Sequence, residues 1–182
     1  IQENTDAKTH LVNSKDLMKS IYNRKFISSE IKDVDIKEGI VTGYFSNFNT
    51  LDSDGDIIRE GAFKQSIQEW FPKGRVKHLL NHQVDKPLGK ITLLKEDSIG
   101  LYYESKIGTH TLGQDFLKMA ESGLVTEHSI GFRTLSEKKS DLGNEITHVQ
   151  LYEGSSLTGW GANENTPLTG MKALTNETLI DR

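Results

Sequence analysis

The order of hydrophobic and polar positions changes character about 38 residues into the chain. Before that point, residues 1–13 are polar and aperiodic, and a short apolar stripe then predicts a helix that Ser14 can cap. Further on, β-branched and aromatic residues gather in short runs that alternate with polar positions and end at Gly, Pro, Asn or Asp. This pattern predicts strands at 38–48, 75–82, 87–97, 99–107, 125–137 and 145–158, and helices at 61–71 and 111–123.

These elements predict one mainly β domain with flanking helices, an α+β class. The expected total is about seven strands and three helices, in a closed or nearly closed β-barrel with the helices packed outside. The expected division is an N-terminal arm and helix at 1–37, the β-barrel domain at 38–160, and a C-terminal tail at 161–182 that carries little pattern.

Composition narrows the function classes. The chain has 182 residues, no Cys, and a formal net charge of −4. No overall positive field exists to hold a phosphate backbone, so nucleic acid is not expected as a partner. No apolar run approaches a membrane span, so no membrane is expected either. Without Cys, any chemistry must use oxygen and imidazole groups.

Two motifs resemble metal-binding sites, but neither has the arrangement of ligands that such a site requires. His78 and His82 are four residues apart, but on a strand that spacing is about 13 Å, too far for one ion. Asp52, Asp54 and Asp56 resemble the start of a calcium loop, yet Phe63 stands where a bidentate Glu is required, which favours a tight turn.

A serine and a histidine remain as candidate catalytic residues. Ser129 lies on a predicted strand in EHSIGF, with Gly131 on the same face, and His82 ends a strand before a loop that contains proline. Glu153 falls on the same face of its predicted strand as apolar residues, so its carboxylate must be paired or hydrogen-bonded. An ion pair with Lys or Arg explains Glu153 equally well on these grounds alone.

Five segments in order resemble the prohead maturation proteases of tailed phages, which are similar in fold to the herpesvirus assembly proteases. They are YFSNFNTLDSDGDIIREGAF, VKHLLNHQVDKPLGKI, DSIGLYYESKI, TLGQDFLKMAESGLVTEHSIGF and LYEGSSLT. The resemblance implies a herpesvirus-protease-like barrel and a serine endopeptidase in which His82 is the general base, Ser129 the nucleophile and Glu153 the third member. His148 is a rival for that third place, because the herpesvirus relatives use a second His.

The resemblance also implies partners and a setting. The expected protein substrates are the major capsid protein, the scaffold and the protease itself, cleaved inside the assembling procapsid in the bacterial host cytoplasm. No cofactor or metal is expected, and a homo-oligomer is left open. The oxyanion donors are also left open, with backbone amides near Gly131 and the Arg133 side chain as candidates.

Two alternatives stay open at this point. One is a catalytically silent β-domain that binds scaffold or capsid protein. The other is a metal-dependent hydrolase that uses His78, His82 or His110 with Asp52 or Asp54.

Overall fold

The computed structural model describes residues 39–163 and 166, together with the backbone of 168–172. These residues belong to one compact unit. The predicted N-terminal arm and its helix lie outside the described residues, as does the chain after 172.

The described part of the chain is mainly β, as predicted. Its strands are β1 (Ile40–Asn47), β2 (Asp56–Ile58), β3 (Lys77–Leu80), β4 (Gln83–Glu96), β5 (Gly100–Ile107), β6 (Glu127–Ser140), β7 (Gly143–Leu157) and β8 (Leu168–Lys172). Its helices are η1 (Ser66–Trp70), a short helix of the π type, and α2 (Thr111–Glu121). They occupy the two regions predicted to be helical.

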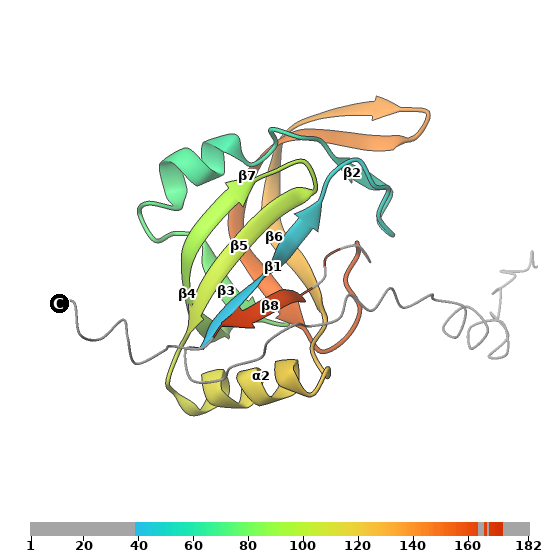
Figure 1. Ribbon diagram of the computed structural model, residues 1–182. Coiled ribbons are helices and arrows are strands. Elements are labelled where there is room, and N and C mark those ends of the chain that lie inside the picture. The colour runs from blue at the N-terminus through green and yellow to red at the C-terminus, as the bar shows by residue number, and fades with distance from the viewer. Residues whose placement is uncertain (1–38, 164–165, 167, 173–182) are drawn as a thin grey trace, which may run out of the picture. The chain divides into compact units, whose positions relative to one another are not determined.

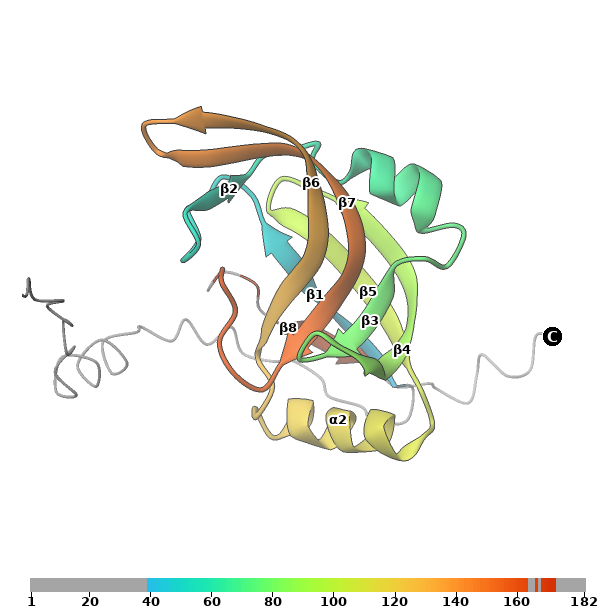
Figure 2. The same cartoon turned by 180° about the vertical axis from the view of Figure 1, so that it is seen from behind.

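All eight strands belong to one sheet. Hydrogen bonds join them in the order β2-β7-β3-β4-β5-β1-β8, and β6 pairs with the other side of β7. The sheet curls strongly, so that β6 comes to lie across from β1 (Figures 1 and 2). These two strands touch, but no ladder joins them in the described part of the chain. The result is a partly open barrel.

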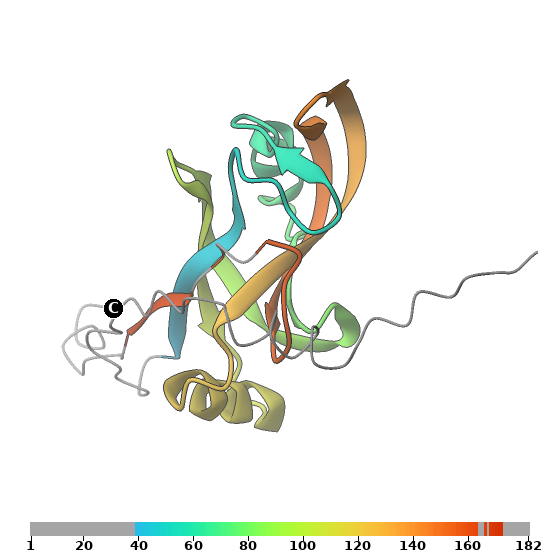
Figure 3. The ribbon, with the colours of Figure 1, turned by 90° about the vertical axis from the view of Figure 1, so that its right-hand side faces the viewer.

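Two strands lie outside the predicted pattern. The three-residue β2 lies in the turn-rich stretch and pairs in parallel with residues 144–146 of β7. Next to it, the β6–β7 hairpin extends past the rest of the sheet (Figure 3). The last strand, β8, lies in the segment expected to be a tail and pairs antiparallel with β1, so the sheet extends past the predicted boundary at 160.

The two helices lie at opposite ends of the curled sheet (Figure 1). Four residues of α2 are buried, Gly113, Phe116, Leu117 and Ala120, and their spacing forms one helical face. Gly123 follows the helix with a φ of +74°, and its N–H donates to the Ala120 carbonyl. A glycine adopts this left-handed conformation at low cost, so Gly123 ends the helix that the sequence predicts over 111–123.

The core fills the inside of the curl. Phe45 of β1 stacks on Tyr103 of β5 with ring centroids 3.7 Å apart, and both rings are fully buried. The Phe45 ring can lie against β7 because residue 154 is glycine; a Cβ at that position would collide with the ring. Each such buried aromatic contributes about 1.5–3 kcal/mol through the apolar surface it removes from water.

The core also holds a polar cluster. His78 of β3 and His128 of β6 are fully buried. His78 Nε2 lies 2.9 Å from Ser156 Oγ, and His128 Nε2 lies 2.7 Å from the Tyr103 hydroxyl. Burial lowers the pKa of His128 to about 4, against the effect of the hydrogen bond to the Thr166 carbonyl. Burial also lowers the pKa of His78 well below its usual range, and the nearby His128 ring lowers it further. Both imidazoles are therefore neutral in the folded protein at neutral pH.

The fold should consequently weaken in mild acid. Because burial depresses both folded-state pKa values, the stability that the neutral rings confer is complete above the unfolded pKa of about 6.5 and is lost as pH falls toward the folded pKa, which is about 4 for His128. We expect the free energy of unfolding, measured with urea, to fall by about 2 kcal/mol through His128 between pH 7.5 and pH 5, and His78 should add to this fall. His128→Gln should remove the part of the slope that His128 causes, and equal pH slopes in the two proteins would contradict a neutral, buried His128.

Candidate active site

Three neighbouring strands build the site. In the sheet, β7 lies between β3, which runs parallel to it, and β6, which runs antiparallel. The register aligns Ser129 of β6 with Ser155 of β7, and Gly131 with Glu153. Because alternate residues along a strand point to the same face, these four residues lie on one face of the sheet, and His128 and Ser156 lie on the other. Residues far apart in sequence are thus brought together by the β3-β7-β6 pairing.

His82 reaches this face from the turn after β3. Asn81 and His82 form a two-residue loop between the paired residues Leu80 and Gln83, with φ angles of +53° and +58°. Positive φ at both positions is the geometry of the tight hairpin turns that match strand twist. The turn is fastened to β7, because Asn81 N donates to the Ser156 carbonyl and the Asn81 side chain exchanges hydrogen bonds with Thr158.

Glu153 receives the histidine. Its Oε1 lies 2.7 Å from His82 Nδ1, while its Oε2 accepts a hydrogen bond of 2.6 Å from Ser155 Oγ. The Glu153 side chain is 10% exposed and that of His82 is 44% exposed. Glu153 therefore has the partners that its place on an apolar face requires, and the partner is a histidine instead of the Lys or Arg that the sequence left open.

The contact with Glu153 determines the pKa and the tautomer of the His82 imidazole. The hydrogen bond to Glu153 is the main cause that raises the pKa of His82, the carboxylate charge adds to it, and partial burial opposes it. With Nδ1–H donating to Glu153, Nε2 carries the lone pair in the neutral ring. His82 is thus held in the tautomer in which Nε2 can accept a proton.

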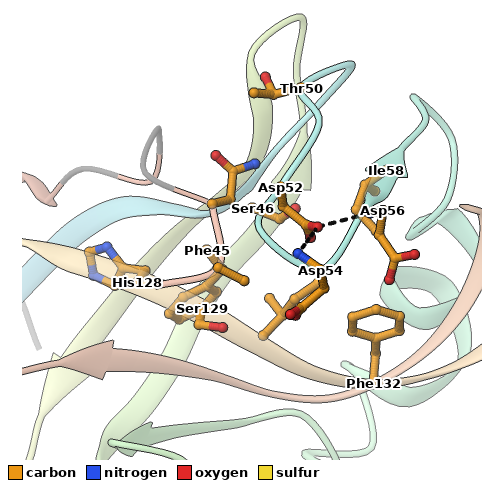
Figure 4. Close-up of a pocket in the computed structure, with 13 residues that line it drawn as sticks. Phe45, Ser46, Thr50, Asp52, Asp54, Asp56, Ile58, His128, Ser129 and Phe132 are labelled. Carbon is orange, nitrogen blue, oxygen red and sulfur yellow. Dashed lines mark hydrogen bonds between the residues drawn. The ribbon is translucent and has the colours of Figure 1, made fainter. Parts of the chain in front are cut away.

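Ser129 lines a cavity beside the acidic loop. The cavity, about 110 Å³, is lined by β1, the loop from 50 to 58, β6 and residues 162–163. Figure 4 shows Ser129 on β6 facing it, across from Asp52 and Asp54. His82 and Glu153 are not among the described residues that line this cavity. No hydrogen bond joins Ser129 to His82 within the described residues, and such bonds are often long without substrate.

The acidic loop beside the cavity is a turn, as the sequence predicts. Asp52 Oδ1 accepts hydrogen bonds of 2.9 Å from the backbone N–H groups of Asp54 and Asp56. Burial raises the pKa of Asp52 against the effect of these bonds. This loop contributes the three carboxylates at the rim of the cavity.

The other candidates lie elsewhere. His148 is exposed and pairs with Ser136, seven residues along β6 from Ser129. His78 is buried in the core, away from the exposed His82, and His110 bonds to the Pro87 carbonyl. Arg133 donates to Gln150 on the exposed part of the hairpin. Within the described residues, no three acidic or histidine side chains gather as ligands.

Sequence reasoning missed Ser155, which contacts both Glu153 and the backbone of His82. Ser155 lies two residues after Glu153 and therefore on the same face of β7. A serine next to a carboxylate on a buried strand face is the sequence feature that identifies it.

Gly131 lies directly against Glu153 across the β6–β7 ladder. A Cβ at residue 131 would collide with the Glu153 carboxylate, at Oε1. Oε1 is the oxygen that binds His82. The glycine thus makes room for the His–Glu pair.

Gly131→Ala should therefore displace Glu153 and reduce turnover. We expect a loss of about a hundredfold in kcat, which is the typical cost of moving a catalytic group by 1 Å. Gly159→Ala is the matched control, because a Cβ there meets no atom within 4 Å. Steady-state kinetics on a peptide substrate measure both, and equal rates for the two variants would refute this role of Gly131.

The comparisons with known proteins agree with the geometry. The sequence model of the family described as "Caudovirus prohead serine protease" matches residues 27–178. The chain belongs to this family. It is 35% identical over 162 residues to the prohead protease of Enterobacteria phage HK97, a match that covers 86% of this chain and 71% of that protein. The family and the serine protease activity predicted from the sequence are confirmed.

A solved capsid protease is similar in fold. The capsid assembly protease gp21 of bacteriophage T4 superposes with a TM-score of 0.55 at 10% identity, covering 66% of this chain and 82% of that one. The varicella-zoster virus protease overlaps with a TM-score of 0.36 at 14% identity, covering 62% and 56%. The first of these supports a shared fold for the capsid proteases of this family and of T4. No described helix is long and apolar enough to cross a membrane.

Proposed function

We propose that this prohead protease cleaves the major capsid protein or its scaffold, and then itself, inside the assembling procapsid in the bacterial host cytoplasm. Its catalytic residues are Ser129, His82 and Glu153. The observation that carries the assignment is the 2.7 Å contact between His82 Nδ1 and Glu153 Oε1, one strand away from Ser129.

The reaction follows from the protonation states. Ser129 Oγ attacks the carbonyl carbon of the scissile peptide bond, and His82 Nε2 takes the hydroxyl proton. Glu153 stabilises the imidazolium that forms. His82 then gives the proton to the leaving amine, and a water molecule, activated by the same base, hydrolyses the acyl-enzyme and regenerates Ser129.

The position of Ser129 suits a protein substrate. An extended peptide that lies in the cavity between β6 and residues 50–58 would pass Ser129.

Co-expression tests the proposal. The wild-type chain, produced with the major capsid protein of the same phage, should shorten that protein and lose mass itself, as read by intact-mass measurement. Ser129→Ala should leave both proteins at full length. Processing of neither protein by the wild type would instead favour a catalytically silent assembly domain.

A further inference from the structure

Ser155 lies between Glu153 and the backbone of His82, and its hydroxyl both donates and accepts a hydrogen bond. Its hydroxyl donates to Glu153 Oε2 at 2.6 Å, and the same oxygen accepts from the His82 backbone N–H at 3.0 Å. The residue is fully buried. Its proton is thus committed to the carboxylate, and its oxygen is out of reach of a substrate.

These two bonds act on the two groups that make up the His–Glu pair. The bond to Oε2 fixes the rotation of the carboxylate, so that Oε1 points at His82 Nδ1. The bond from His82 N fixes the backbone of a histidine whose φ is +58°, a conformation that non-glycine residues adopt only when neighbouring groups hold it. One hydroxyl therefore sets the position of both partners.

We propose that Ser155 is a positioning residue, which holds Glu153 and the backbone of His82 so that Nδ1 stays bonded to Glu153 Oε1 and Nε2 stays free to accept the proton of the nucleophile. This inference rests on the proposed function, since it requires His82 to be the base. It goes beyond that function by assigning a fourth residue to the catalytic unit and by stating that this residue acts only through the other two.

Ser156 offers a matched control. It is the next residue on β7, equally buried, and it also bonds to a histidine, His78, but on the opposite face of the sheet. Ser155→Ala and Ser156→Ala each remove one buried hydroxyl from the same strand. A purely structural role for Ser155 predicts similar effects of the two variants on both stability and turnover.

We expect the kinetics to separate them. Ser155→Ala should lower kcat by about tenfold to a hundredfold with little change in KM, because the base and its carboxylate lose their alignment. The acid limb of its pH profile should move to lower pH, since a looser Glu153 contact raises the pKa of His82 less. Ser156→Ala should keep both kcat and the pH profile, whatever its thermal midpoint.

A double-mutant cycle then tests whether Ser155 acts through Glu153. In a Glu153→Gln background, Ser155→Ala should cost at most about threefold, whereas independent roles predict the full loss again. Ser155→Thr, which keeps a hydroxyl, should restore most of the rate if the variant folds.

The outcomes distinguish the inference from the proposed function. Equal kcat values and equal pH profiles for Ser155→Ala and Ser156→Ala, beside an inactive Ser129→Ala, would overturn the role of Ser155 and leave the catalytic assignment standing. An active Ser129→Ala would overturn the catalytic assignment itself. Labelling of Ser155 by a fluorophosphonate probe would contradict both.

Discussion

Ser129→Ala should abolish proteolysis while the protein stays folded. Loss of a nucleophilic serine costs on the order of a million-fold in turnover when the serine, histidine and acid act as one unit. Ser129 is only partly buried, and no described hydrogen bond depends on its hydroxyl, so the thermal midpoint should hardly change. Peptide hydrolysis measured beside circular dichroism checks both expectations.

Ser155→Ala is a useful companion, because it removes the serine directly opposite Ser129 in the ladder. If Ser129 is the nucleophile, Ser155→Ala retains measurable turnover and Ser129→Ala retains none above background. Wild-type-like processing by Ser129→Ala would end this assignment.

Glu153→Gln should slow turnover by about a hundredfold to ten-thousandfold. The amide keeps the shape of the side chain but removes the charge that stabilises the imidazolium in the transition state. His148→Gln is the control, since His148 is exposed and lies opposite Ser136. It should leave the rate close to that of the wild type, and the reverse pattern would assign the third place to His148.

The pH dependence of the rate in the same variants tests the His82–Glu153 pairing independently. In the wild type Glu153 raises the pKa of His82, so His82 loses its proton, and the rate rises, at a pH above the ordinary imidazole value of about 6.5. Glu153→Gln removes both the charge and the acceptor, so the midpoint should move to lower pH as the plateau falls. A midpoint that stays in place, or that moves to higher pH, would contradict the pairing. Rates must be taken where each variant is still folded, because acid also charges His78 and His128.

Local pattern accounts for most of the strands and for both described helices. Alternation and β-branched residues mark the long strands, and Gly123 marks the end of α2, because these features depend on residues close in sequence. The pattern gave no sign of β2, which is three residues long, or of β8, because pairing with β7 and β1 determines them and a local pattern does not.

The site shows the same division. Strand parity alone indicates that Glu153 needs a partner, because it places a carboxylate among apolar residues. The identity of that partner depends on the parallel pairing of β3 with β7, which joins residues more than 70 positions apart and leaves no trace in local spacing. His82 and Ser129 were therefore predicted from the family resemblance, whereas the contacts of Ser155 and Gly131 with Glu153 emerge from the geometry.

The most direct measurement is active-site labelling with a fluorophosphonate probe, followed by peptide mapping. We expect one labelled residue, Ser129, with a labelling rate that falls at low pH as His82 is protonated and that falls strongly in Glu153→Gln. Label on another serine, or equal labelling of wild type and Ser129→Ala, would contradict Ser129 as the nucleophile.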